Sequence, residues 1–297
     1  SILVATMHHI ASDAWSTSIL VKEVVELYNA YTEQRAASLA QMQLQYADYS
    51  IWQRNYLKGE LLDKKIAYWK EKLDSVATLQ LPTDYKRPAV QSTRGSSVPF
   101  KIDKELSDQL HKLSKAEGTT LFITLQAIYK ALLYRYSGQS DISVGTSIAR
   151  REQHQLEGLI GFFVNTLALR DEVRGESSIR EWQEQVRATT MEAYEHQEVP
   201  FEKVVEVVIK DRDKSRSPLF QVMLVLQNTP EVPELKLGEV RLSGEQYEHT
   251  TIKFELTFFI RETREGLQGT VQYCSDLYNP ETIQRMTQHF MELLRSA

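Results

Sequence analysis

The sequence predicts an α/β protein of the layered α+β kind, and three patterns lead to that prediction. Apolar residues recur at helical spacing in several stretches, for example between Ser16 and Tyr31. Residues 142–148 alternate as a strand does, with Ile142 and Val144 on one face. Residues 219–227 are apolar on both faces, which is typical of a central, covered strand. Helices and strands mixed along one chain indicate a fold built of packed layers.

The first part of the chain is predicted to be mainly helical. We expect a strand at residues 2–8, a polar turn at 9–16, and a helix from Ser16 to about Tyr31. A second helix is predicted at residues 46–56. A third helix is expected to carry the apolar residues Ile66, Trp69 and Leu73.

Residues 81–99 have the composition of a linker. They hold three prolines, one glycine and many polar side chains, and such stretches interrupt regular structure. We therefore divide the chain into a first lobe at residues 1–80, an inter-lobe linker at 81–99 and a second lobe at 100–297.

Several helix starts in the second lobe carry recognisable capping residues. Leu106, Leu110 and Leu113 mark one helix, and Thr120 is placed to cap the next. Ser178 is followed three residues later by Glu181, which fits a capping box. The dipeptide at 279–280 (Asn-Pro) is a favourable start for the last helix.

The strands of the second lobe complete the prediction of mixed layers. Residues 254–261 and 267–274 are predicted to pair as a hairpin. Together with the covered strand at 219–227, they account for the sheet that the helices are expected to cover.

The bulk composition excludes several classes of function. The net charge of −5 argues against nucleic-acid binding, because a phosphate backbone needs a basic face. Cys274 is the only cysteine, so neither an intramolecular disulfide nor a cysteine-based zinc site can form. No apolar run approaches the roughly 20 residues that span a bilayer, and no signal peptide is visible. We therefore expect a cytoplasmic protein without membrane attachment.

Because residues 2–5 are apolar, we also expect a fragment whose strand partners lie upstream.

The densest cluster of reactive side chains lies at residues 8–13 (HHIASD). Two histidines, His8 and His9, stand at the end of the predicted strand, and Asp13 comes four residues after the second. Histidine exchanges protons near neutral pH, so catalysis is one interpretation. The alternative is structural: a hydrogen-bonded core histidine, with Ser12 and Asp13 as helix caps. A metal site is not expected, because adjacent strand residues point to opposite faces.

Five motifs in a fixed order resemble one known family, the condensation domains of nonribosomal peptide synthetases. The first, at 8–13, resembles the family's His-His-x-x-x-Asp-Gly signature. The other four are YADYSIW at 46–52, IGFFVNT at 160–166, HQEVPFE at 196–202 and RDKSRSPLFQ at 212–221. The similarity extends to KFELT at 253–257. Beyond the signature, we interpret most motif residues as structural, since residues that pack are the common case.

The resemblance implies a two-lobed fold and a reaction. Each lobe would be similar to chloramphenicol acetyltransferase, the two would form a V with a tunnel between them, and the first lobe would be incomplete here. Donor and acceptor would be thioesters on 4'-phosphopantetheine arms of separate peptidyl carrier domains, beside an adenylation domain. No cofactor bound by the domain itself is implied. The acceptor amine would attack the donor thioester carbonyl and form an amide bond.

The resemblance also assigns roles to individual residues. His9 is expected to act as the general base or to position the amine, while His8 faces the core and supports the strand. Asp13 is expected to be architectural and to pair with an arginine of the other lobe. Arg151 is the first candidate for that partner and Arg150 the second. A further residue expected to support the site, by holding a backbone carbonyl, is Asn165.

The loop after the histidines departs from the family at one position. Ala14 stands where the family has glycine, before Trp15 and Ser16. If the position requires a positive φ, alanine strains the loop; if glycine only leaves space, one methyl group is tolerated. Two rival functions therefore stay open: a non-catalytic docking module of the same fold, and a stand-alone acyltransferase acting on soluble thioesters. The amino-acid sequence of the motifs favours a domain that joins an L-configured donor to an L-configured acceptor. We also expect this chain alone to be inactive, because one wall of its tunnel is missing.

Overall fold

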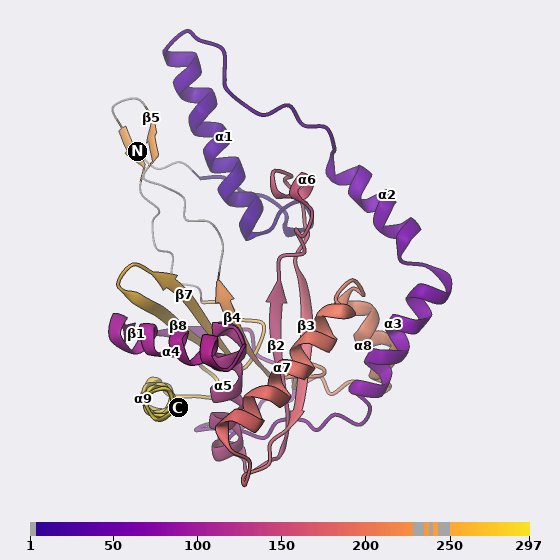
Figure 1. Ribbon diagram of the computed structural model, residues 1–297, viewed down its shortest axis with the longest axis vertical. Helices are drawn as coiled ribbons and strands as arrows, with labels where there is room; N and C mark the ends of the chain where they lie inside the picture. Colours follow the sequence, from indigo (N-terminus) through magenta and orange to yellow (C-terminus); the bar gives the residue numbers. More distant parts are fainter. Residues whose placement is uncertain (1–3, 228–234, 238–239, 243–249) are drawn as a thin grey trace. The chain divides into compact units, whose positions relative to one another are not determined.

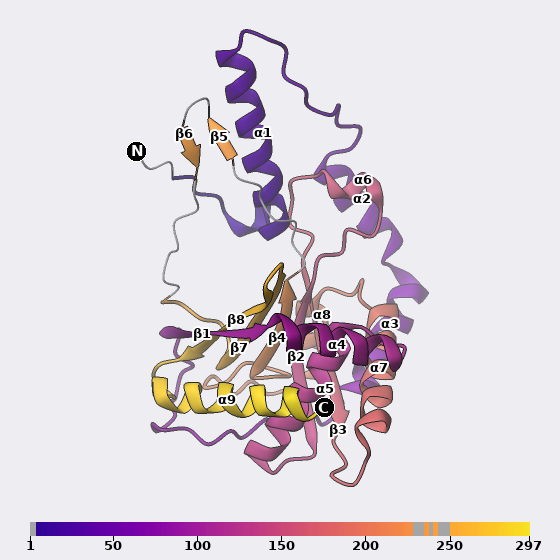
Figure 2. The ribbon, with the colours of Figure 1, turned by 60° about the vertical axis from the view of Figure 1, so that its left-hand side comes forward.

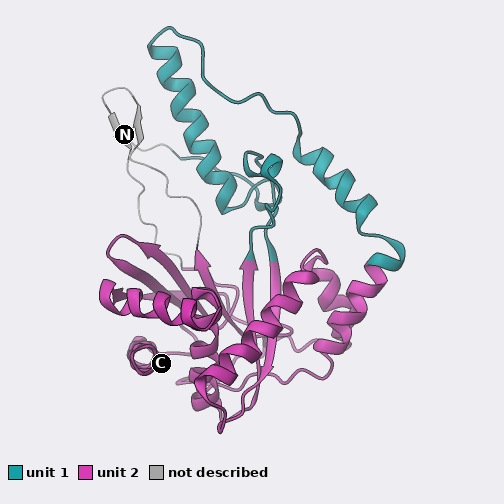
Figure 3. Ribbon diagram, viewed as in Figure 1, with its two compact units in different colours: residues 1–61, 148–165, 229–247 teal, residues 62–147, 166–228, 248–297 magenta. Residues whose placement is uncertain are grey.

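The computed structural model describes residues 4–227, 235–237, 240–242 and 250–297. The chain forms two compact units, coloured separately in Figure 3. Unit 1 comprises residues 1–61, 148–165 and 229–247, and unit 2 comprises residues 62–147, 166–228 and 248–297. Each unit is therefore assembled from segments that are far apart in the sequence.

Unit 1 is mainly helical. It contains the 3₁₀ turn η1 (His9–Ala11), α1 (Ala14–Thr32), α2 (Tyr46–Tyr56) and the short α6 (His154–Glu157). Strands β5 (Leu235–Leu237) and β6 (Val240–Leu242) form an antiparallel pair. A small core holds the unit together where α2 meets the segment 156–163; its buried members are Tyr49, Leu156, Leu159 and Phe163.

Unit 2 is built on a six-stranded mixed sheet, visible in Figure 1. The strand order is β1-β8-β7-β4-β2-β3. The bounds are β1 Gly95–Asp103, β2 Asp141–Ile148, β3 Asn165–Glu172, β4 Val222–Gln227, β7 Leu256–Thr263 and β8 Gly266–Cys274. β4 is parallel to β2 and β7, whereas β8 is antiparallel to β7 and β1. The predicted hairpin and the predicted covered strand are both confirmed.

Three helices pack on strands of this sheet: α4 (Lys104–Ala116), α5 (Leu121–Ser137) and α9 (Pro280–Ser296), the last of them beside β1 in Figure 2. α7 (Ile179–Glu195) packs on α5, and the remaining helices are α3 (Gly59–Lys72) and α8 (Phe201–Val208). Thr120 caps α5, Ser178 and Glu181 form the capping box of α7, and Asn279 precedes α9, all as predicted. The mixed α/β class predicted from the sequence is therefore present.

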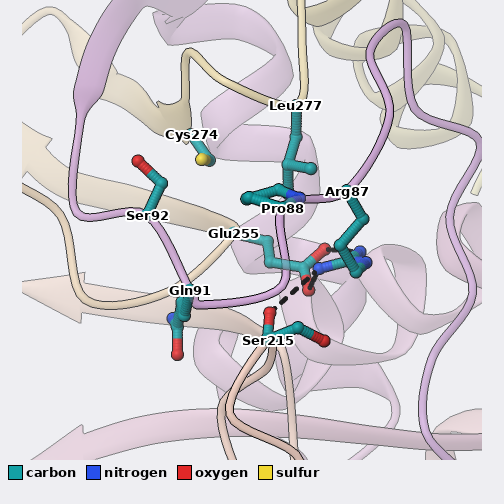
Figure 4. A pocket seen from close by; sticks show the side chains of 8 residues that line it. All are labelled: Arg87, Pro88, Gln91, Ser92, Ser215, Glu255, Cys274 and Leu277. Carbon is teal, nitrogen blue, oxygen red and sulfur yellow. Dashed lines mark hydrogen bonds and ion pairs between the residues drawn. The ribbon is translucent and has the colours of Figure 1, made fainter.

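The segment 79–94, most of it in the predicted linker, belongs to unit 2 and is held there by polar contacts. Arg87 forms a two-pronged ion pair with the buried Glu255, at 2.7 and 2.9 Å. The Gln91 amide nitrogen donates to Ser217 Oγ at 2.9 Å. Figure 4 shows Arg87, Gln91 and Glu255 around a small pocket that Cys274 also lines. The motifs at 212–221 and 253–257 therefore supply residues that bind this segment. Residues 95–99 already belong to β1.

The strand predicted at residues 2–8 is wrong for the residues that the structure describes. Residues 4–8 are exposed and lie in no strand, and η1 begins directly after them. An apolar run becomes a strand only where another strand offers a hydrogen-bonding edge, and none of the described strands pairs with it. Residues 2–3 lie outside the described residues. In the described part of the chain, no helix is both long and apolar enough to cross a membrane.

Candidate active site

The two neighbouring histidines hold opposite ring tautomers. The backbone N–H of Ile10 donates to His8 Nδ1 at 3.1 Å, so this nitrogen carries no proton and the neutral ring is protonated on Nε2. His9 Nδ1 lies 2.6 Å from the carbonyl oxygen of Ser12. Because a carbonyl oxygen only accepts, His9 Nδ1 must donate, and Nε2 of the neutral ring keeps its lone pair. His9 therefore presents a basic nitrogen where His8 presents an N–H.

The position expected for His8 is not observed. We predicted a core-facing side chain supporting a strand, but His8 is exposed and stands at the N-cap of η1. The backbone turns into η1 immediately after it, so the alternation that would bury one histidine of the pair does not apply. His9 is exposed as well, and its ring lies edge-to-face with Phe162, with 5.0 Å between ring centroids.

Asp13 ends the histidine loop and begins α1. Its Oδ1 accepts the backbone N–H of Ser16 at 2.8 Å, which is the N-cap interaction, and the Ser16 hydroxyl at 2.7 Å. Its Oδ2 accepts the backbone N–H of Phe163 at 3.1 Å. Both carboxylate oxygens therefore accept hydrogen bonds, which join the start of α1 to the segment that carries Phe163.

The arginine that pairs with Asp13 is Arg151. Its Nη2 lies 3.1 Å from Asp13 Oδ1, and the two side chains are 1% and 5% exposed. Its Nη1 donates to the carbonyl oxygens of Leu156 and Leu159 at 2.6 and 2.7 Å. The guanidinium also lies 4.2 Å from the centre of the Phe163 ring, within cation–π range. Both members of the pair belong to unit 1.

The Ser16 hydroxyl connects the two halves of this network. It accepts from Arg151 Nη2 at 2.9 Å and from the Gly161 N–H at 3.0 Å. Its single proton lies between two acceptors, Asp13 Oδ1 at 2.7 Å and the Gly161 carbonyl at 2.8 Å. Because Ser16 is fully buried, all of these bonds are shielded from water.

Competing effects set the pKa of Asp13. Burial alone raises the pKa of a carboxyl group, because it disfavours the charged form. The hydrogen bonds from Ser16 and Phe163 and the charge of Arg151 together outweigh burial and hold the pKa of Asp13 below its ordinary value. Asp13 is therefore ionised at neutral pH and balances Arg151.

The alanine that replaces the family glycine is not strained. Ala14 is the first residue of α1, is exposed, and does not have a positive φ. A helical residue at this position needs no glycine, so the first of the two alternatives for this departure does not apply. Trp15 follows and donates from Nε1 to the Glu157 carbonyl at 3.0 Å, which ties α1 to α6.

The two other predicted support residues, Arg150 and Asn165, stand at the two ends of the segment 150–165. Arg150 has a left-handed φ of 50°, and its guanidinium lies 3.0 Å from the side-chain amide group of Gln53. Asn165 is buried and is the first residue of β3.

The sequence reasoning missed three contributors to the site: the Ser12 carbonyl, the ring of Phe162, and the Tyr46 hydroxyl, which donates to the Phe162 carbonyl at 2.7 Å. Phe162 and Tyr46 stood in motifs that we interpreted as packing. The Ser12 contact had no sequence signal, because any residue has a backbone carbonyl.

The chemistry available at this site is acid–base and polar. His9 offers a lone pair on an exposed ring, and the Asp13–Arg151 pair holds the loop that carries it. Across the residues with described side chains, no group of three or more histidine, cysteine or acidic side chains is placed to hold a metal ion.

Comparison with known proteins identifies the family. The model of the condensation domain matches residues 1–297. One of the linear gramicidin synthase proteins of Brevibacillus parabrevis is 47% identical over 292 residues, which are 98% of this chain and 6% of that protein. The chain therefore spans a small part of the length of this curated relative.

Solved structures give the same picture. The X-domain in a complex with OxyB from teicoplanin biosynthesis is 29% identical with a TM-score of 0.85, over 98% of this chain and 65% of that one. Holo-AB3403, a four-domain nonribosomal peptide synthetase bound to AMP and glycine, is 25% identical with a TM-score of 0.83, over 98% of this chain and 23% of that one. These matches confirm the fold class and the resemblance carried by the five motifs.

Proposed function

The chain belongs to the condensation-domain family, and from that premise we propose that it forms an amide bond within a nonribosomal peptide synthetase. The donor is an aminoacyl or peptidyl thioester and the acceptor an aminoacyl thioester, each on the phosphopantetheine arm of a carrier domain. The observation that supports this most directly is the tautomer of His9, in which Nε2 is the unprotonated nitrogen of the neutral ring.

The reaction follows from the chemistry of an amine and a thioester. The acceptor amine attacks the donor carbonyl carbon, a C–N bond forms, and the carbonyl oxygen becomes an oxyanion. His9 Nε2 takes the proton that the attacking nitrogen must lose. The C–S bond then breaks, the departing sulfur takes up a proton, and the product remains on the acceptor arm. A free amine is already nucleophilic, so holding it beside Nε2 contributes alongside proton transfer.

Asp13, Ser16 and Arg151 act on this reaction through geometry. Asp13 caps α1 and, with Ser16, binds the segment that carries Phe162 and Phe163. The loop holding His9 is thereby fixed at its C-terminal end. His8 presents an N–H at Nε2, so it is not a second base of the same kind.

The test is a condensation assay with the full-length protein and its loaded donor and acceptor carriers, read by the intact mass of the acceptor carrier. His9→Ala is expected to lower the rate by two to four orders of magnitude, the range for losing a general acid–base group. The matched control is His154→Ala, because His154 is a histidine of the same unit with a 93% exposed side chain. If both variants condense at the wild-type rate, His9 has no catalytic role.

A second candidate function rests on one of the structural matches. The X-domain of similar fold is seen in a complex with OxyB. A docking module that binds a protein partner without catalysis is therefore the alternative. Absence of product from the wild-type protein with well-matched carriers, together with retained binding of a partner protein, would favour that alternative.

The remaining assignments belong to the same proposal. The expected partners are the donor and acceptor carrier domains and a neighbouring adenylation domain, and the phosphopantetheine belongs to the carriers. A cytoplasmic location agrees with a single, buried cysteine that forms no disulfide. The stand-alone acyltransferase alternative is tested by offering soluble acyl thioesters in place of loaded carriers.

A further inference from the structure

Phe162 is an aromatic residue that is held firmly but not buried. Its side chain is only half-buried, and its ring stands at 86° to the ring of His9. We infer that Phe162 is a positioning residue, which holds the His9 ring so that Nε2 faces the reacting amine. The effect of Phe162 on the condensation rate rests on the proposed function, whereas its effect on the orientation of the His9 ring does not.

The backbone around Phe162 is fixed at three consecutive residues. Gly161 exchanges hydrogen bonds with the Ser16 hydroxyl, and the Phe162 carbonyl accepts from the Tyr46 hydroxyl. The Phe163 N–H donates to Asp13 Oδ2. A β-carbon at position 161 would lie 2.2 Å from the Tyr46 ring, so only glycine permits this close approach. The position of the Phe162 ring is therefore set by the groups that also fix the histidine loop.

The adjacent phenylalanine shows what a packing residue looks like at this place. Phe163 is 1% exposed and contacts the rings of Tyr46 and Tyr49, and the guanidinium of Arg151 lies against it. Phe163 thus supplies the apolar core of unit 1. Phe162 is not a buried member of that core, and its ring contacts His9.

His9 needs a second contact to hold one orientation. Its described hydrogen bond, from Nδ1 to the Ser12 carbonyl, fixes the tautomer but lets the ring pivot about that bond. A perpendicular aromatic neighbour resists this pivoting, because tilting the ring gives up the edge-to-face arrangement. The contact of an aromatic pair corresponds to a change of about three- to tenfold in a rate or an equilibrium.

The experiment compares Phe162→Leu with Phe162→Tyr, which keeps the ring, in the full-length protein. The control is Phe122→Leu, the same change at a half-buried phenylalanine of α5 in unit 2. Two readouts are taken: kcat and KM for condensation on loaded carriers, and the ¹⁵N chemical shifts of the His9 ring, assigned with His9→Gln. The second readout needs no turnover.

Phe162→Leu is expected to lower kcat by about three- to tenfold with little change in KM, and to shift and broaden the His9 ring ¹⁵N signals, because the ring then pivots among several orientations. Phe162→Tyr and Phe122→Leu are expected to keep kcat and the His9 ring ¹⁵N signals at their wild-type values. Unchanged ¹⁵N signals in Phe162→Leu overturn the inference, as does a loss in Phe162→Tyr equal to that in Phe162→Leu. If the wild-type protein forms no product, the proposed function fails while the ¹⁵N comparison still decides the role of Phe162.

Discussion

Replacing Asp13 by alanine leaves the Arg151 guanidinium buried without its counter-ion. The two side chains are 5% and 1% exposed, so water does not replace the lost carboxylate. Breaking one partner of a buried pair costs about 3–5 kcal/mol, and we expect Asp13→Ala to lower the free energy of unfolding of unit 1 by about 4 kcal/mol. Asp13→Asn keeps the shape and one accepting oxygen, but its NH₂ group faces the Phe163 N–H, so we expect a loss of about 2 kcal/mol.

The assay is urea unfolding combined with hydrogen exchange measured on peptides from residues 8–20 and 148–165, which report on unit 1. The control is Asp108→Ala, which removes the carboxylate of an exposed pair with Lys104 and is expected to cost a small fraction of that amount. The sign of the pH dependence follows from the lowered pKa of Asp13. Its contribution is complete above the unfolded pKa of about 3.9 and is lost as pH falls through the lower folded value. A cost below about 1 kcal/mol for Asp13→Ala, or one equal to that of Asp108→Ala, would refute the reasoning.

Two further predictions concern unit 2 and the loop. In unit 2, Asp171 pairs with the fully buried Lys130 and accepts from Thr189 Oγ1 at 2.6 Å. Asp171→Ala is therefore expected to lower the free energy of unfolding, measured in urea, by about 3–5 kcal/mol. The double variant with Lys130→Met should recover most of that loss, because no unpaired charge remains. An equal loss in the double variant would contradict this expectation. In the loop, Ala14→Gly is expected to change the condensation rate by less than about twofold, because Ala14 already has helical geometry. A tenfold gain in rate would show instead that the methyl group of Ala14 hinders the site.

Local patterns predicted most of the secondary structure correctly. The helix at 46–56, the cap at Thr120, the capping box at 178–181 and the hairpin of β7 and β8 all formed as expected. These features depend on side chains within a few residues of one another, so their physical cause is contained in the sequence itself.

The errors arose where an element needs a distant partner. The apolar run at 2–8 reads as a strand, yet residues 4–8 pair with no described strand. The apolar residues of α1 correctly predicted a helix, but Val24, Leu27 and Tyr31 are exposed. Periodicity specifies which side of a helix is apolar, and the rest of the fold decides whether that side is covered.

The sequence by itself determined the family, the helices with their caps, and the pairing of two histidines with an acid four residues later. The tertiary structure decided which nitrogen of each histidine carries the proton, that Arg151 and not Arg150 meets Asp13, and that Phe162 stands against His9. The physical reason is sequence separation. Asp13 and Phe163 are 150 residues apart in the sequence. Only the folded chain brings the backbone N–H of Phe163 to the carboxylate of Asp13, and burial there strengthens the hydrogen bond between them.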